Sequence, residues 1–70
     1  MASKRVLIVD DEENIGRSLR MILEREGYAV SVCRSVAEFT RHPDAHRADV
    51  YLLDMKLHDG SGIDLLRAVR

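Results

Sequence analysis

The stretch VLIVDD at residues 6–11 decides the fold of this 70-residue chain, because four consecutive apolar residues end on two acids. A run with no polar residue has no solvent-facing side, and it is typical of a parallel strand covered by helices on both faces. The stretch VYLLD at residues 50–54 repeats the pattern and also ends on an acid. We therefore expect two interior parallel strands, each followed by carboxylates.

Between these strands, residues 28–33 (YAVSVC) alternate apolar and small side chains, which suits an edge strand. Residues 13–26 precede this segment and carry apolar residues at helical spacing, with Gly27 as a natural helix end. The pattern predicts an amphipathic helix followed by a strand. The apolar positions of this helix are Ile15, Leu19, Ile22 and Leu23.

Two further helices are predicted from their starting signals. Residues 35–38 (SVAE) have the spacing of a capping box, so a helix should begin there and end before Pro43. Another should begin after the turn residues 60–62 (GSG) and run towards residue 70. The side chains of this last helix that are expected to face inward are Ile63, Leu66 and Val69.

The order strand, helix, strand, helix, strand, helix predicts a doubly wound α/β fold with right-handed crossovers. Because the second strand suits an edge and the other two suit the interior, the expected order of the three-stranded parallel sheet is 2-1-3, with helices on both faces. The chain direction then reverses at the first strand. Such a reversal leaves a crevice beyond the carboxyl ends of the first and third strands.

Asp10, Asp11 and Asp54 border this predicted crevice, where α/β proteins place their ligand sites. Carboxylate oxygens, with water and a phosphate oxygen, are the ligands that Mg²⁺ prefers. A carboxylate also attacks phosphorus when a cation neutralises the charge on the transferred group, and Asp54, alone at its strand end, is the expected nucleophile. In the alternative interpretation each acid only caps a helix or a turn.

The composition limits the other classes of function. A formal charge of −1, with 46% hydrophobic and 33% charged residues, is typical of a globular chain without a nucleic-acid-binding surface. The single cysteine, Cys33, predicts a buried thiol in a reducing compartment. The four apolar residues after the basic N-terminus are too few for a signal peptide or a membrane span. We expect a cytoplasmic protein that binds neither DNA nor a membrane.

The segments VLIVDDEENI (6–15) and LLDMKLHDGSG (52–62) resemble the receiver domain of two-component response regulators, and the similarity spans the whole chain. The resemblance implies a flavodoxin-like fold in which Asp54 accepts a phosphoryl group from a sensor histidine kinase. It also implies that Asp11 and Asp54 bind Mg²⁺ directly, that Asp10 helps through water, and that the backbone carbonyl of Lys56 completes the ligand set. Such a module is a signalling phosphoprotein rather than an enzyme.

A complete receiver of this family has two more strand–helix units, which carry a hydroxyl residue and a lysine at the phosphoryl site. Neither residue can be assigned here, so we expect residues 1–70 to be the N-terminal half of a receiver domain, with a truncated sheet. Phosphorylation is then expected to be impaired, because fewer groups stabilise the transferred charge. A second departure is His58, which stands where the family most often has proline and should change loop stiffness rather than chemistry.

Two alternatives remain open at this point. A bare interior strand at residues 50–53 offers unpaired N–H and C=O groups, so the chain could instead be a self-associating half-domain without phosphotransfer. That hypothesis predicts a homodimer or a higher oligomer joined through this strand. A phosphatase is less favoured, because such sites usually place an Asp-x-Asp pair after the first strand, whereas Asp10 and Asp11 are adjacent.

Overall fold

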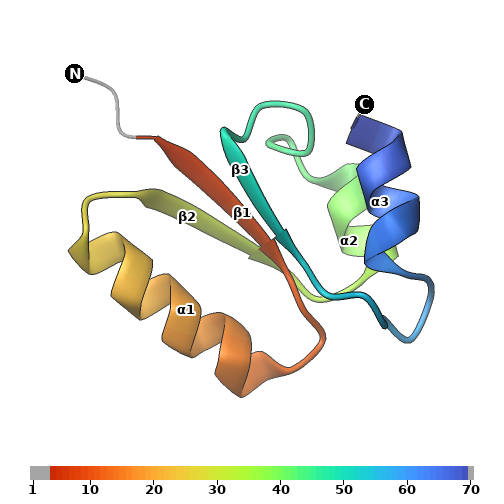
Figure 1. The fold of residues 1–70 in the computed structure, drawn as a ribbon, viewed down its shortest axis with the longest axis horizontal. Coiled ribbons are helices and arrows are strands. Elements are labelled where there is room, and N and C mark those ends of the chain that lie inside the picture. The colour runs from red at the N-terminus through yellow and green to blue at the C-terminus, as the bar shows by residue number, and fades with distance from the viewer. Residues whose placement is uncertain (1–3, 70) are drawn as a thin grey trace.

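The computed structural model describes residues 4–69 and contains three strands and three helices in strict alternation (Figure 1). Each predicted element is present, and its type agrees with the pattern from which it was predicted. The expectation that the strand at residues 50–53 is interior was wrong for the described structure, because no described strand pairs with its second side and none of its residues is fully buried. The elements are β1 (Arg5–Val9), α1 (Glu13–Arg25), β2 (Ala29–Cys33), α2 (Val36–Arg41), β3 (Val50–Leu53) and α3 (Gly62–Val69).

The strands form one parallel sheet in the order β2-β1-β3, which confirms the predicted topology. β1 is the central strand, and its Val6 lies opposite Val30 of β2 and Val50 of β3. The apolar run at residues 6–9 of β1 follows from this position, because all four of these residues are buried. The first crossover leads from β1 to β2 on one side of it, and the second leads from β2 to β3 on the other side. The direction in which successive strands are added to the sheet therefore reverses at β1.

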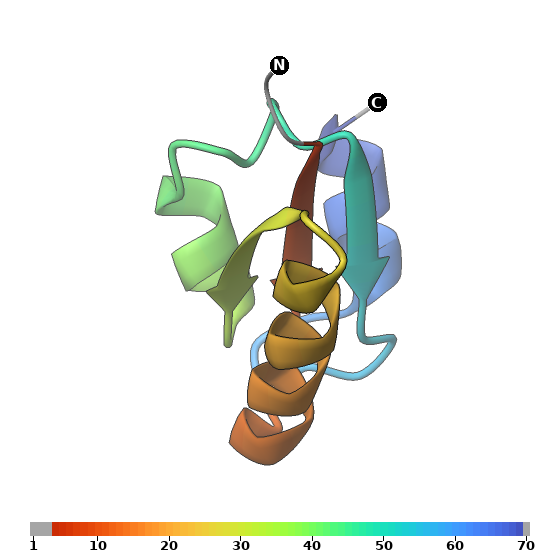
Figure 2. The same ribbon diagram turned by 90° about the vertical axis from the view of Figure 1, so that its left-hand side faces the viewer.

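Helices cover both faces of the sheet, as expected. Figure 1 shows α1 on one side and α2 with α3 on the other, and Figure 2 shows the same layers after a quarter turn. Each face has its own apolar cluster. The α2/α3 face buries Leu7, Val9, Cys33, Phe39, Ala45, Leu57 and Leu65. The α1 face buries Val6, Ile8 and Val30, with Leu19, Leu23 and Val32 packed against them.

The first helix matches its predicted range, and Gly27 follows it with a φ of 92°, a conformation that favours glycine. Its apolar stripe is only partly buried. Leu19 and Leu23 pack against the sheet, whereas Ile15 and Ile22 are 47% and 57% exposed. The stripe is wider than the surface that the strands offer on this face, so its outer members remain in solvent.

The second helix confirms the serine half of the predicted capping box. Ser35 Oγ accepts a hydrogen bond from Glu38 N–H at 3.0 Å, and the helix ends before Pro43 as expected. The glutamate half differs, because Glu38 Oε1 accepts from Arg34 N–H at 3.3 Å rather than from the amide of Ser35. The carboxylate therefore secures the residue that joins β2 to the helix.

The predicted inward face of the third helix was wrong at two positions. Ile63 and Leu66 are 47% and 49% exposed, while Leu65 is the residue buried against the sheet. The physical reason lies at Gly62, where an added Cβ would stand 2.5 Å from the Asp54 carbonyl oxygen. This close approach turns positions 62 and 65 towards the sheet. The side chain of Val69 lies outside the described part of the structure.

Cys33 is fully buried at the end of β2, which confirms the predicted buried thiol. Burial raises the pKa of this thiol to about 11, and the negative charges of Glu38 and Asp44 add to the effect. Among the described residues, no helix has the length and apolar character needed to cross a bilayer.

Candidate functional site

The structure brings the three predicted acids together at one edge of the sheet. Asp10 and Asp11 follow β1, Asp54 follows β3, and one carboxylate oxygen from each residue lies within 4.8 Å of the other two. All three residues are half-buried. The cause is the parallel register that pairs Val9 with Leu53, because neighbouring parallel strands end at the same edge.

Backbone hydrogen bonds extend this alignment past the ends of the strands. Asp54 N–H donates to Val9 O at 2.8 Å, and Asp10 N–H donates to Cys33 O at 3.0 Å. Both acids are therefore anchored to the neighbouring strand through their own main chain. Their side chains start from fixed points of the sheet rather than from mobile loops.

Two of the carboxylates also shape the turns that follow them. Asp10 Oδ1 accepts from Glu12 N–H at 2.9 Å, and Asp54 Oδ1 accepts from Lys56 N–H at 3.1 Å. Both contacts are Asx-type turns, in which an aspartate bonds the backbone two residues ahead. Within the described part of the chain, the other oxygen of each side chain accepts no hydrogen bond, so it is free for a further ligand.

The alternative that Asp10 or Asp11 only caps the first helix does not match the geometry. The N-cap of α1 is Glu12, and no side chain caps this helix in the described structure. Asp10 uses one of its two carboxylate oxygens to form a turn, so the other oxygen can still bind a metal ion. A turn-forming aspartate and a metal ligand are thus compatible in the same residue.

Lys56 lies in the loop after β3, and its backbone amide donates to Asp54 Oδ1 as described above. The ligand role of its carbonyl stays a prediction. The same loop closes tightly at residues 57–60, where Leu57 N–H donates to Gly60 O at 2.9 Å. Leu57 is buried, so this turn is attached to the core.

Two hollows flank the acidic cluster, and apart from the three acids the sequence reasoning did not identify the residues that line them. One has a volume of about 360 Å³ and lies beside Asp10 and Asp54 on the α1 face, where its other walls are Ile8, Leu19, Leu52 and Leu53. The second has a volume of about 270 Å³ and contains Asp11. The walls of the second are completed by Arg34, Ser35, Glu38 and His58.

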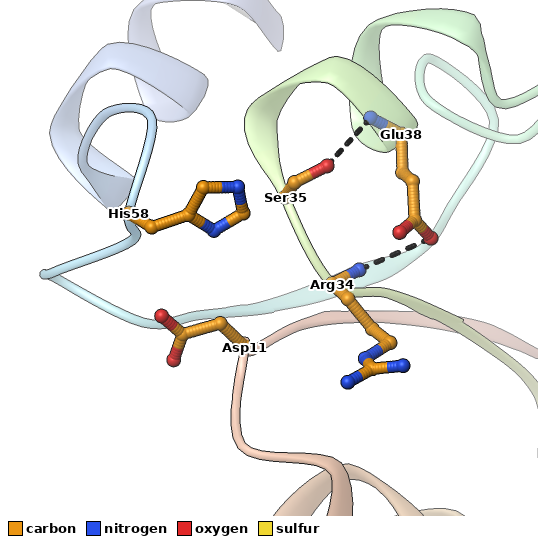
Figure 3. Close-up of a pocket in the computed structure, with 5 residues that line it drawn as sticks. All are labelled: Asp11, Arg34, Ser35, Glu38 and His58. Carbon is orange, nitrogen blue, oxygen red and sulfur yellow. Dashed lines mark hydrogen bonds between the residues drawn. The ribbon is translucent and has the colours of Figure 1, made fainter.

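Figure 3 shows the second hollow, with the imidazole of His58 directed towards the start of α2. Arg34 follows β2, so it comes from the same edge of the sheet as the acids, and this position was a signal that sequence reasoning could have used. Its guanidinium lies 3.9 Å from Glu13. The second hollow thus has the positive charge of Arg34 and the negative charge of Glu38 in its walls next to Asp11.

The fold and this edge of acids agree with comparisons to known proteins. The family model of the response regulator receiver domain matches residues 6–70. The acid tolerance regulatory protein ActR of Rhizobium meliloti is 37% identical over 67 residues, which is 96% of this chain and 34% of ActR. The transcriptional regulatory protein KdpE of Mycobacterium tuberculosis is 43% identical over 65 residues, or 93% of this chain and 29% of KdpE.

Solved structures give the same result. The non-phosphorylated HemR receiver domain from Leptospira biflexa superposes with a TM-score of 0.84 and 32% identity, covering 96% of this chain and 54% of that one. The response regulator protein TrrA from Thermotoga maritima, solved in complex with Mg(2+)-BeF, has a TM-score of 0.85 and 31% identity, covering 96% and 58%.

These matches define a class first: a flavodoxin-like, doubly wound parallel sheet with acids at the carboxyl edge of its strands. The chain belongs to the receiver domain family of two-component response regulators. It spans about a third of the length of the regulators named above and somewhat more than half of the solved receivers.

Proposed function

We propose that residues 1–70 are the first three strand–helix units of a receiver domain, and that Asp54 accepts a phosphoryl group from a sensor histidine kinase. The observation that carries the proposal is the approach of Asp10, Asp11 and Asp54 to within 4.8 Å of one another. The family match and the place of Asp54 at the end of β3 also support it.

The donor set fits Mg²⁺, which takes one or two carboxylates and keeps several waters. In the proposal Asp11 and Asp54 bind the ion directly, Asp10 holds one of its waters, and the Lys56 carbonyl is the remaining protein ligand. When bound, the ion would neutralise negative charge on the transferred group. The similar regulator TrrA was solved with Mg(2+)-BeF, which supports this assignment.

Asp54 supplies the nucleophile in this proposal. Its Oδ1 accepts the Lys56 amide and keeps a second lone pair for the ion, so the other oxygen is the one that attacks phosphorus. A P–O bond forms to the carboxylate while the P–N bond to the kinase imidazole breaks, and the electron pair of that bond stays on the ring nitrogen. The product is an acyl phosphate, so Asp54 is an acceptor and turns over no substrate by itself.

The cytoplasm remains the predicted location, and the absence of a nucleic-acid-binding role for this segment also remains a prediction.

Magnesium binding is the first test. Calorimetric titration should show one Mg²⁺ site, and Asp11→Asn and Asp54→Asn should each weaken it by at least about tenfold, since each removes a direct charged ligand. Glu26→Gln is a matched control, because it removes one negative charge after the far end of α1. Equal affinity of all four proteins would overturn the metal assignment.

Phosphoryl transfer is tested by intact mass after incubation with acetyl phosphate and Mg²⁺. One phosphoryl group should appear on the chain over a long incubation, and none on Asp54→Asn. Hydroxylamine should remove the group, because it cleaves an acyl phosphate. An adduct on both proteins, or on neither, would contradict the role proposed for Asp54.

A second candidate function, self-association through β3, is favoured by a separate observation. β3 pairs with β1 alone among the described strands, and its Val50 and Leu52 are 43% and 38% exposed. An edge of this kind pairs readily with another strand, and a two-fold pairing of β3 with a second copy would continue the sheet. The occupant that we propose for this edge is a second copy of the chain.

Light scattering over a concentration series tests this second candidate. The wild-type chain should show the mass of a dimer or a higher oligomer, and Leu52→Lys should shift it to monomer, because an edge lysine opposes pairing. Met21→Lys is the control, since Met21 is 61% exposed on α1. A monomeric wild-type chain at every concentration would exclude this candidate and leave the receiver role untouched.

A further inference from the structure

The carboxylate of Asp59 connects the loop after β3 to the start of α2. Its Oδ1 accepts from Val36 N–H at 2.9 Å and its Oδ2 accepts from Ala37 N–H at 3.1 Å. The partners are 23 and 22 residues apart in the chain. The donors are the first two amides of α2, which have no partner inside their own helix.

The charged form of Asp59 is the one that suits these contacts. The hydrogen bond from Val36 lowers the pKa of this carboxyl most, and the Ala37 amide and the charge of His58 act in the same direction. A carboxylate accepts both bonds with equivalent oxygens, whereas an amide side chain has one acceptor oxygen only.

The loop that carries Asp59 is closely packed on both sides. A Cβ added at Gly60 would stand 2.7 Å from Cγ2 of Val36, on α2. On the other side, Gly62 lies against the backbone carbonyl of Asp54, as described for the fold. The loop therefore occupies the space between the second helix and the main chain of the acceptor.

Residues 54–60 hold the predicted ligand Lys56 between two fixed points. At the first point Lys56 N–H donates to Asp54 Oδ1 at 3.1 Å. At the second, Leu57 and Gly60 exchange backbone hydrogen bonds of 2.9 and 3.3 Å, which places Asp59 at the tip of a tight turn. A movement of the tip away from α2 would therefore reach the Lys56 peptide three residues earlier.

Asp59 and Ser35 cap different amides of α2, and only the Asp59 cap comes from a distant loop. Ser35 Oγ accepts from Glu38 N–H at 3.0 Å. Because Asp59 belongs to the loop after β3, its bonds to the first two amides of α2 also fix that loop against the helix. Ser35 thus acts within its own helix, whereas Asp59 also holds the loop after β3 in place.

We propose that Asp59 is a positioning residue for the metal site, and that its two hydrogen bonds to α2 hold the loop so that the Lys56 carbonyl faces the acids. The inference rests on the magnesium site proposed above. In this proposal the contact between Asp59 and the two amides strengthens binding of the ion. Because coupling between two sites is reciprocal, a bound ion strengthens that contact by the same factor.

The test compares Mg²⁺ affinity and amide exchange in Asp59→Ala and Asp59→Asn, under conditions in which circular dichroism shows both to be folded. Titration calorimetry should give Mg²⁺ binding about fivefold to tenfold weaker than wild type, in the usual range of coupling between sites. Mg²⁺ should raise the exchange protection of the Val36 and Ala37 amides in wild type but not in either variant.

Two matched controls separate positioning from simpler effects. Ser35→Ala removes the local cap of the same helix and leaves the Asp59 contact in place, so it should lower stability with little change in Mg²⁺ affinity. Asp64→Asn removes the same charge at the start of α3 without touching α2, and it should leave Mg²⁺ affinity within about twofold.

The possible outcomes distinguish the two proposals. Wild-type affinity in folded Asp59→Ala would overturn the positioning role and leave the metal site intact. Equal weakening by Ser35→Ala would mean that α2 stability alone matters, and equal weakening by Asp64→Asn would mean that only charge matters; either result also overturns the role. If wild type binds no Mg²⁺, the metal site fails and the positioning role fails with it.

Discussion

The two faces of the sheet differ in how completely they are covered. On the α2/α3 face, seven buried residues form one cluster that includes Leu7, Phe39 and Leu65. On the α1 face three apolar side chains of the strands are buried, and the helix that covers them leaves Ile15 and Ile22 about half exposed. The same central strand thus contributes to one closely packed layer and to one partly open layer.

The difference shows how the site is supported. The turn after β3 is attached to the closed face through Leu57 and to α2 through Asp59, so the loop beside Asp54 belongs to the better packed layer. The open face borders the same acids through the hollow lined by Leu19 and Leu52. The exposed apolar residues of β3, Val50 and Leu52, also lie on this open side of the molecule. β3 is the strand that we propose to pair with a second copy of the chain.

The largest expected effect comes from the same substitution made on each face. Leu65→Ala on the closed face should lower the free energy of unfolding by about 3 kcal/mol, because it removes a fully buried side chain. Leu19→Ala on the open face should lower it by about 1 kcal/mol, since that side chain is half-buried. Urea unfolding followed by circular dichroism, at one protein concentration, measures both values.

Leu66→Ala is the control for this comparison, because Leu66 is the next residue of α3 and is 49% exposed. Its effect should stay within about 0.5 kcal/mol. If Leu66→Ala is as destabilising as Leu65→Ala, the burial of α3 is not as described. If Leu19→Ala equals Leu65→Ala, the two faces are equally packed.

A smaller effect is expected from adding one methyl group on each face. Gly62→Ala should destabilise by about 1–3 kcal/mol, since its Cβ would meet the Asp54 carbonyl, a backbone atom that cannot move aside. Gly16→Ala places its Cβ 3.1 Å from Cγ1 of Val32, a half-buried side chain with room to shift. The better helix propensity of alanine, up to about 1 kcal/mol, offsets that contact.

The melting temperatures of the two glycine variants provide the measurement. Gly62→Ala should melt well below wild type, and Gly16→Ala should melt close to it. The opposite order would show that the α1 face is the tighter one. Gly62→Ala should also weaken Mg²⁺ binding, because the added Cβ meets the main chain of Asp54, a proposed ligand of the ion.

The smallest effect concerns the pH dependence of stability through Cys33 on the closed face. Its pKa in the folded chain is raised to about 11 from 9.0, so the native state retains the thiol proton where the unfolded state has lost it. The stabilisation is complete below pH 9 and is lost as the pH rises from 9 towards about 11.

Urea unfolding of wild type and Cys33→Ala at a series of pH values checks this sign. The stability difference between the two proteins should shrink as the pH passes 9. A constant difference would mean that the thiol titrates alike in both states. The open face offers no counterpart among the described residues, since Cys33 is the single cysteine of the chain.

Most of the fold followed from local patterns in the sequence. The uninterrupted apolar runs predicted the two strands that carry the acids, Gly27 predicted the end of α1, and Ser35 predicted the start of α2. These signals act within a few residues, so they can be read without knowing the rest of the structure. The order of the strands followed because the alternating pattern of residues 28–33 suited an edge, which left the first strand at the centre.

The inward face of α3 could not be predicted in the same way. Ile63, Leu65 and Leu66 are all apolar, so their spacing defines no single stripe, and the choice was made by the contact between Gly62 and the Asp54 backbone. The exposure of Ile15 and Ile22 has a similar origin. It depends on how much of the sheet lies beneath α1, which is a property of the assembled layers.

The sequence by itself determined the elements, their order and the edge at which Asp10, Asp11 and Asp54 emerge, because periodicity and strand direction are set by neighbouring residues. Only the tertiary structure decided which side chains close each face, which hollows adjoin the acids and that Asp59 reaches the amides of α2. Those features join residues that are distant in the chain, and such contacts depend on packing rather than on any local pattern.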